Sequence, residues 1–374
     1  MSDKKLQFFI FFNIFFLAII VNSIPPLMTT LQDNYSLTIG FSSFLPLART
    51  IGNMSVSIIG AFIIAILGLR NSLLLGIIFE ILGVFLFIIS KDIYTLIFSM
   101  FFIGASMGQT ILSLISMFDH LPEEFQKYGL LHAFFGFGGI TGPLIISFIL
   151  RNNINYKFPF YIYEFVFLFI FFFIILKKVP ENVKYKAFKF TEALSVLKNK
   201  FIIYILVIFI MYSGVEIGAV TWAGNLFTDQ FNIPKDSASI FISLFWVFFT
   251  IGRLLTDTLY KKFNFTLTTI FSLFSAITLI IMISIKSFSP YAFSILGIML
   301  GPIFPVTQKF LNSHLSHREV GLVSGIVSLS IGIGASIITT LMGFVGDFSI
   351  LYSYLIPITG LLIVFIFSIM VRKL

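Results

Sequence analysis

Residues 177–200 read KKVPENVKYKAFKFTEALSVLKNK and form the one long polar segment of an otherwise apolar chain. The segment carries seven Lys and two Glu, and it divides the 374 residues into halves of similar length. On each side of it lie apolar runs of about 20 residues, the length that crosses the hydrocarbon layer of a bilayer. Six such runs precede the segment and six follow it. The pattern predicts twelve transmembrane helices in two sets of six.

The predicted fold is an all-α membrane protein with two pseudo-symmetric six-helix bundles. We expect an N-terminal bundle (1–176), a cytoplasmic basic linker (177–200) and a C-terminal bundle (201–374). The twelve spans are expected at residues 6–28, 37–67, 71–90, 93–117, 128–150, 158–176, 201–227, 236–260, 265–286, 289–312, 319–343 and 349–371.

Composition excludes a soluble protein and several kinds of chemistry. Hydrophobic residues make up 58% of the chain and charged residues 11%, more apolar than a soluble core of this size accommodates. Cysteine is absent, which removes disulfides and thiolate chemistry. The net charge of +8 is spread over short loops and forms no basic face for nucleic acid. No cofactor is expected, and the HLSHRE stretch at 314–319 lacks the companion ligands of a metal site.

The distribution of Lys and Arg predicts the orientation. Seventeen of the 24 lie at the N-terminus, in the even-numbered connections and at the C-terminus, five lie in the odd connections, and Arg49 and Arg253 lie within spans. Positive residues concentrate on the cytoplasmic side of membrane proteins. Both termini are therefore expected in the cytoplasm.

Several local patterns resemble one known family. Residues 131–143, LHAFFGFGGITGP, match a fifth-helix pattern of the fucose–galactose–glucose:proton symporters, a group of bacterial sugar permeases in the major facilitator superfamily. Residues 297–310, GIMLGPIFPVTQKF, look like the tenth helix of that group. Seventh- and eighth-helix patterns are similar at Tyr212, Gly214, Glu216, Trp222, Phe245, Trp246, Gly252 and Arg253.

The resemblance implies the major facilitator fold and proton-coupled import of a sugar by alternating access. The chain departs from the family in two places. The cytoplasmic loop signature is reduced in residues 60–75 to Gly60, Gly68 and Arg70. Fucose-type permeases also carry carboxylates in helices 1 and 4, where this chain has Asn22 (and Asn13) and Gln109.

Glu216 is the principal candidate for substrate binding and proton coupling. A charge in the middle of a membrane costs about 2.5–3.5 kcal/mol on insertion scales, and a carboxylic acid lowers this cost when it is protonated. The alternative is a structural acid that is hydrogen-bonded within its bundle.

Other residues are expected to line the same solute path. Asn22 and Glu216 fall at matching depths in helices 1 and 7, as Gln109 and Gln308 do in helices 4 and 10. Amides and a carboxylate suit sugar hydroxyls; the alternative is interhelical hydrogen bonding. Two tryptophans are candidates to pack against a sugar ring, with ordinary packing as the alternative. The expected substrate-binding set is Asn22, Gln109, Glu216, Trp222, Trp246 and Gln308.

A second set is predicted to act in conformational change. Glycines allow helices to approach closely and a proline bends a helix, so Gly138, Gly142 and Pro143 are expected at a pivot or gate. His132 precedes them, as a gating residue or as a packing histidine. Arg253 and Asp257 stand at i and i+4, a spacing that lets them pair on one helix face as a latch.

The leading hypothesis is a monomeric transporter that imports a monosaccharide or polyol together with H⁺. Sodium coupling and uncoupled transport stay open, because the helix 1 and helix 4 carboxylates are missing. The alternative function is export of drugs or apolar metabolites, and a third class is a membrane sensor or scaffold. No nucleophile and base stand at a spacing that indicates an enzyme.

Overall fold

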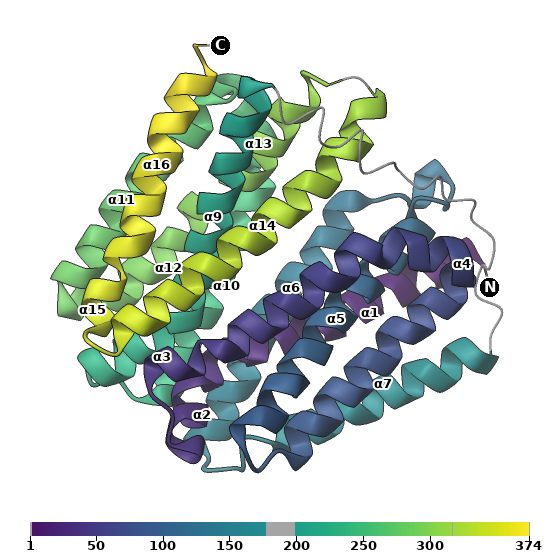
Figure 1. Ribbon diagram of the computed structural model, residues 1–374, viewed down its shortest axis with the longest axis horizontal. Helices are drawn as coiled ribbons and strands as arrows, with labels where there is room; N and C mark the ends of the chain where they lie inside the picture. The colour runs from purple at the N-terminus through teal and green to yellow at the C-terminus, as the bar shows by residue number, and fades with distance from the viewer. Residues whose placement is uncertain (1, 177–198, 316, 374) are drawn as a thin grey trace. The chain divides into compact units, whose positions relative to one another are not determined.

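The computed structural model describes residues 2–176, 199–315 and 317–373, together with all side chains in these ranges except those of Tyr128, His132 and residues 317–322. The predicted basic linker thus lies almost entirely outside the described residues. All regular secondary structure in the described part is helical. Figure 1 shows the helices and their labels.

The chain divides into two compact units, and each is described by itself. Unit 1 contains α1 (Asp3–Ser23), α4 (Phe44–Ile89), α5 (Ile93–Phe118), the short turn η2 (Glu123–Phe125), α6 (Tyr128–Arg151) and α7 (Phe158–Leu176). Unit 2 contains η1 (Pro25–Leu27), α2 (Met28–Tyr35), α3 (Ile39–Ser42), α9 (Lys200–Asn225), η3 (Leu226–Gln230), α10 (Lys235–Phe263), α11 (Thr266–Ser284), η4 (Lys286–Phe288), α12 (Ser289–Leu300), α13 (Ile303–Asn312), α14 (His317–Gly346), α15 (Ile350–Ser353) and α16 (Leu355–Val371).

The segment Pro25–Ser43 belongs to unit 2, although it was expected in the N-terminal bundle. The first span was expected to continue to residue 28, but α1 ends at Ser23. Pro25 and Pro26 follow, and a proline has no N–H with which to continue the helical hydrogen-bond series. The chain therefore leaves α1 and begins a separate short helix, α2, that packs in unit 2.

Within the described residues, eleven helical segments are long and apolar enough to cross a membrane. One of them contains α4, whose 46 residues form two helical parts joined at a kink. At Gly68 its backbone is not helical, with φ 77° and ψ 165°. The predicted second and third spans lie on either side of this glycine, and the prediction of a many-helix membrane fold is confirmed.

The predicted tenth span is one segment in sequence but two helices in the structure. α12 ends at Leu300 and α13 begins at Ile303. Pro302 lacks an N–H, so it cannot continue the helical hydrogen-bond series. The GP dipeptide at 301–302 thus separates the two helices.

Side chains form hydrogen bonds with main-chain groups at two helix ends in unit 1. Asp92 caps α5, because its carboxylate accepts hydrogen bonds from Thr95 N at 2.9 Å and from Thr95 Oγ1 at 2.8 Å. At the end of α4, Lys157 Nζ donates to Ile88 O at 3.1 Å and to Ser90 O at 2.7 Å. These bonds satisfy main-chain groups that a helix end leaves without partners.

Two glycines of α6 bring it against α1. A Cβ atom on Gly138 would lie 2.6 Å from Phe15 O, and one on Gly142 would lie 2.7 Å from Ile19 O. Any larger side chain would therefore separate the helices. Pro143 follows directly and is buried inside α6.

Candidate functional site

Glu216 lies beside Tyr212 and Arg253 in unit 2. Tyr212 and Glu216 are one turn apart on α9, and Arg253 comes from α10. The guanidinium attracts the carboxylate and the tyrosine hydroxyl faces it, but no direct salt bridge joins these two described charges. Glu216 is partly accessible as a residue.

Three buried polar atoms of this cluster have no hydrogen-bond partner of ordinary geometry: Tyr212 Oη, Trp246 Nε1 and Arg253 Nε. Unsatisfied polar atoms inside a protein are uncommon, and each needs an explanation such as a missing ligand or water. Tyr212 and Arg253 lie beside Glu216, and Trp246 is linked to Arg253 through Phe249, so we infer that a polar solute can bind here.

Phe249 contacts both cluster residues on α10, Trp246 and Arg253. Its ring centroid is 5.2 Å from that of Trp246 and 4.5 Å from Arg253 Cζ. The three side chains share one face of α10, because their spacing follows the helical repeat. The Phe249 ring thus contacts both the indole of Trp246 and the guanidinium of Arg253.

The cluster combines hydrogen-bond donors, a carboxylate and aromatic rings. The indole and guanidinium nitrogens only donate, while Glu216 accepts when it is ionised. A solute with several hydroxyl groups can both accept and donate, and its apolar ring face can pack on an aromatic side chain. The chemistry therefore suits a neutral polyhydroxylated solute.

The three predicted amides make contacts within their own units. Asn22 Nδ2 donates to Ala18 O at 2.9 Å in its own helix, and Gln308 Nε2 donates to Asn312 Oδ1 at 2.9 Å. Gln109 is fully buried, and its amide bonds to Ser72 Oγ. The last contact joins α5 to α4, which is the hydrogen-bonding role that the sequence left open as an alternative.

Trp222 is a packing residue in this structure. No part of it is exposed, and its indole N–H donates to Thr339 O of α14 at 2.9 Å. Stacking against a solute would require α9 and α14 to separate. Trp246 differs because its indole nitrogen is unpartnered.

The expected Arg253–Asp257 pair is not formed. Asp257 Oδ1 instead accepts from Lys309 Nζ of α13 at 2.8 Å, and both side chains are largely exposed. Arg253 is held by the Phe249 ring. The i, i+4 spacing allowed the pair, but α13 offered a cation that sequence proximity did not show.

The predicted gating residues are only partly described. The side chain of His132 lies outside the described part of the structure. Gly138, Gly142 and Pro143 are buried in α6, and both glycines contact α1. This contact is the close helix approach expected of the glycines, while the proposed pivoting stays a prediction.

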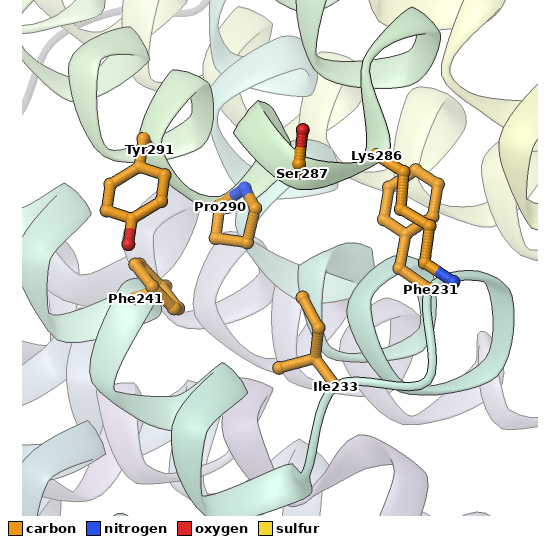
Figure 2. A pocket seen from close by; sticks show the side chains of 7 residues that line it. All are labelled: Phe231, Ile233, Phe241, Lys286, Ser287, Pro290 and Tyr291. Atoms are coloured by element: carbon orange, nitrogen blue, oxygen red, sulfur yellow. The ribbon is translucent and has the colours of Figure 1, made fainter.

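An open pocket of about 290 Å³ lies elsewhere in unit 2. It is formed where the α9–α10 connection meets the start of α12, and Figure 2 shows its mostly apolar wall. Its lining residues are Phe231, Ile233, Phe241, Lys286, Ser287, Pro290 and Tyr291. It contains none of the predicted site residues, so it is distinct from the Glu216 cluster.

A polar network around Asn225 was not expected from the sequence. Asn225 Nδ2 donates to Gln32 Oε1 at 2.6 Å and to Asp229 Oδ2 at 2.7 Å. Nearby, Asp33 pairs with Lys235. The proline pair after α1 indicated that the first helix ends there. Nothing in the sequence indicated that the following segment, Pro25–Ser43, would pack in unit 2.

Residues 10–301 match the sequence profile of the Major Facilitator Superfamily. The chain belongs to this superfamily. It is therefore a multi-pass membrane transporter and not an enzyme, and the predicted family is confirmed.

Two proteins are similar in sequence over most of their length. The glucose/mannose transporter GlcP of Bacillus subtilis (strain 168) is 24% identical over 290 residues, which are 73% of this chain and 71% of that protein. The protein TsgA homolog of Buchnera aphidicola (strain APS) is 23% identical over 309 residues, 80% of this chain and 78% of the relative.

Solved structures show the same fold. The E. coli fucose:proton symporter FucP matches with a TM-score of 0.68 at 19% identity, over 99% of each chain. A D-xylose-proton symporter matches with a TM-score of 0.79 at 16% identity, over 100% of this chain and 98% of the other. The comparisons confirm the resemblance to sugar permeases that the helix patterns indicated.

Proposed function

We propose that this chain is a secondary active transporter that moves a monosaccharide or related polyol together with a proton by alternating access. The observation that carries the proposal is the set of unpartnered polar atoms on Tyr212 and Arg253 beside the partly accessible Glu216, and on Trp246, which is linked to Arg253 through Phe249. A glucose/mannose transporter among the relatives and the fucose and xylose proton symporters among the similar folds support the same substrate class and ion.

In the proposed mechanism, the solute and the proton act on the same group. Arg253 attracts the carboxylate of Glu216 while it is charged. A proton on Glu216 removes that attraction and frees the guanidinium to donate to a solute hydroxyl, while the indole of Trp246 donates to another. With both cargoes bound, Glu216 is neutral and the positive charge of Arg253 is hydrogen-bonded to the solute instead of being attracted to a carboxylate.

Further parts of the proposal concern topology and gating. The excess of Lys and Arg in even-numbered connections supports cytoplasmic termini, and the transporter is proposed to act as a monomer. The conformational role predicted for Asp257 is retained with Lys309 as its partner, and α6 is retained as a pivot on α1.

The test is transport by the full chain in proteoliposomes under an imposed proton gradient, with a panel of radiolabelled monosaccharides and polyols. Glu216→Gln keeps the shape and hydrogen-bonding capacity of a protonated acid but cannot release a proton. It is expected to abolish uphill accumulation while retaining exchange of internal for external sugar.

The matched control is Glu124→Gln, an exposed carboxylate in η2, which is expected to accumulate sugar normally. Normal uphill accumulation by Glu216→Gln would remove Glu216 from the coupling mechanism. Movement of apolar dyes but of none of the sugars would replace the proposal with the exporter interpretation.

A further inference from the structure

A second carboxylic acid is enclosed in unit 1, away from the residues used above. Glu80 of α4 is fully buried, and neither carboxylate oxygen has a hydrogen-bond partner. Ser106 of α5 is the neighbouring hydroxyl, but it does not reach either oxygen with ordinary hydrogen-bond geometry. The side chain is therefore aimed into the protein with nothing to stabilise a negative charge.

The surroundings of Glu80 are closed by the contact of α4 with α5. Gly76 and Gly83 lie on the same face of α4, about one turn before and one turn after Glu80. A Cβ on Gly76 would lie 2.9 Å from Thr110 N, and one on Gly83 would lie 2.8 Å from Ile103 N. Because the backbones nearly touch on both sides of Glu80, little water can reach it from α5.

Glu164 lies on the antiparallel helix α7, which packs against α4. The rings of Phe87 and Phe160 stack with centroids 4.0 Å apart on one side of this pair, and Arg70 Nη2 donates to Ile175 O at 2.9 Å on the other. The two glutamates fall at the same level between these contacts, and their negative charges repel each other.

Among the described residues, no cation is paired with either glutamate. α5 carries no charged side chain at all. The two arginines of α4 donate to main-chain carbonyls elsewhere, Arg49 to Val21 O at 3.1 Å and Arg70 at the end of α7. Tyr163 of α7 bonds to Ser23 at 3.2 Å. No described cation therefore compensates a negative charge on Glu80 or Glu164.

We propose that Glu80 and Glu164 form a proton-binding carboxyl pair inside unit 1, a second protonation site in addition to Glu216. Two carboxyl groups that share a site without a cation cannot both be ionised, so they hold at least one proton between them. Glu164 is partly accessible whereas Glu80 is fully buried. A proton therefore enters the pair from the side of Glu164.

This site gives unit 1 an acid that exchanges protons, although Asn22 and Gln109 occupy the places of the carboxylates in fucose-type permeases. Its part in transport rests on the proposed function, but its protonation is measurable without any solute. Sodium is the competing ligand, and the test includes it.

The experiment is an infrared pH titration of the purified full-length protein, which follows the C=O absorption of protonated carboxyl groups. The parent is expected to show a protonated carboxyl band near neutral pH that disappears as the pH rises. Glu80→Gln is expected to lose this band, and Glu123→Gln, an exposed acid in η2, is expected to keep it. Replacing sodium by choline is expected to change nothing.

Glu164→Gln is the second variant, because it alters a half-buried position and leaves the α4–α5 contact intact. It is expected to move the pH at which the Glu80 band disappears, since the repelling charge is gone. The proposal would be overturned by a band that persists in Glu80→Gln or that does not titrate. It would also be overturned if the pH at which the band disappears were unchanged in Glu164→Gln, or if that pH depended on sodium. Glu216→Gln is expected to keep the band, so failure of the transport hypothesis and failure of this one are separate results.

Discussion

Asn225 of α9 donates a hydrogen bond to Gln32 Oε1 of α2 at 2.6 Å, and both side chains are buried. The two residues are 193 positions apart in sequence. Gln32 also bonds to Ser42 Oγ at 2.8 Å, so the amide pair connects α9 to two parts of the segment Pro25–Ser43. This segment leaves its sequence neighbours and becomes part of unit 2 through buried polar contacts.

Asn225→Leu is expected to loosen this segment. The change leaves the buried Oε1 of Gln32 without the Asn225 donor, which costs about 1–3 kcal/mol. The measurement is maleimide labelling of Leu31→Cys, a fully buried position in a chain without other cysteines. Labelling is expected to be slow in the Leu31→Cys parent and faster by about tenfold with Asn225→Leu added. Asn34→Ala removes only a bond to Thr30 O in its own helix, and equal acceleration by that control would contradict the explanation.

Gly138→Ala and Gly142→Ala are expected to destabilise unit 1. The new Cβ atoms would meet main-chain oxygens of α1 at 2.6 and 2.7 Å, and overpacking of this kind costs about 1–3 kcal/mol. Thermal unfolding of the purified protein in detergent measures the effect. Gly129→Ala in the same helix meets no atom within 4 Å and is expected to be neutral or slightly stabilising. A lower melting temperature in that control than in the other two variants would refute the packing argument.

Gly68→Ala is expected to lower stability through the backbone. The φ of 77° with ψ of 165° lies in a region that only glycine adopts without strain, and such strain costs about 1–3 kcal/mol. The same unfolding measurement has a control of opposite sign in Gly325→Ala on α14, which meets open space and is expected to gain about 0.5–1 kcal/mol in a helix. An unchanged melting temperature for Gly68→Ala would show that the two halves of α4 do not need this geometry.

Asp92 gives a pH dependence to the start of α5. Hydrogen bonds from Thr95 hold the pKa of the Asp92 carboxyl below its ordinary value of 3.8. Because the folded-state pKa is lowered, the stabilisation is complete above the ordinary value and is lost as the pH falls through the lower, folded value. Amide hydrogen exchange of residues 93–96 is expected to be faster in Asp92→Ala than in the parent near neutral pH. The difference is expected to shrink in acid, and a constant difference would exclude the ionised cap.

Arg253→Gln is expected to weaken solute binding while leaving the protein folded. A hydrogen bond to a charged donor contributes about 1.5–3 kcal/mol, so the apparent affinity for sugar is expected to fall by roughly tenfold or more. Sugar counterflow in proteoliposomes measures this. Lys261→Gln, an exposed cation in the last turn of the same helix, is expected to bind as the parent does. Equal losses in both variants would indicate a general effect of charge and not a contact at the site.

Local patterns predicted most of the helices because a membrane span needs only a run of apolar residues, and this property is readable without knowledge of contacts. The predicted span 158–176 coincides with α7, and 93–117 differs from α5 by one residue. Errors arose where a helix ends inside an apolar run, as after Ser23 and between Leu300 and Ile303. Proline marked both places, but hydropathy does not register a break in hydrogen bonding.

The sequence by itself determined the membrane class, the two sets of six spans, and Glu216 as a carboxylic acid inside an apolar span. Tertiary structure alone decided which groups meet: Arg253 with Glu216, Asp257 with Lys309, Asn225 with Gln32, and Glu80 with Glu164. The reason is physical. Insertion into a membrane depends on the summed hydropathy of neighbours along the chain, whereas the partner of a polar side chain depends on how helices distant in sequence are rotated and aligned.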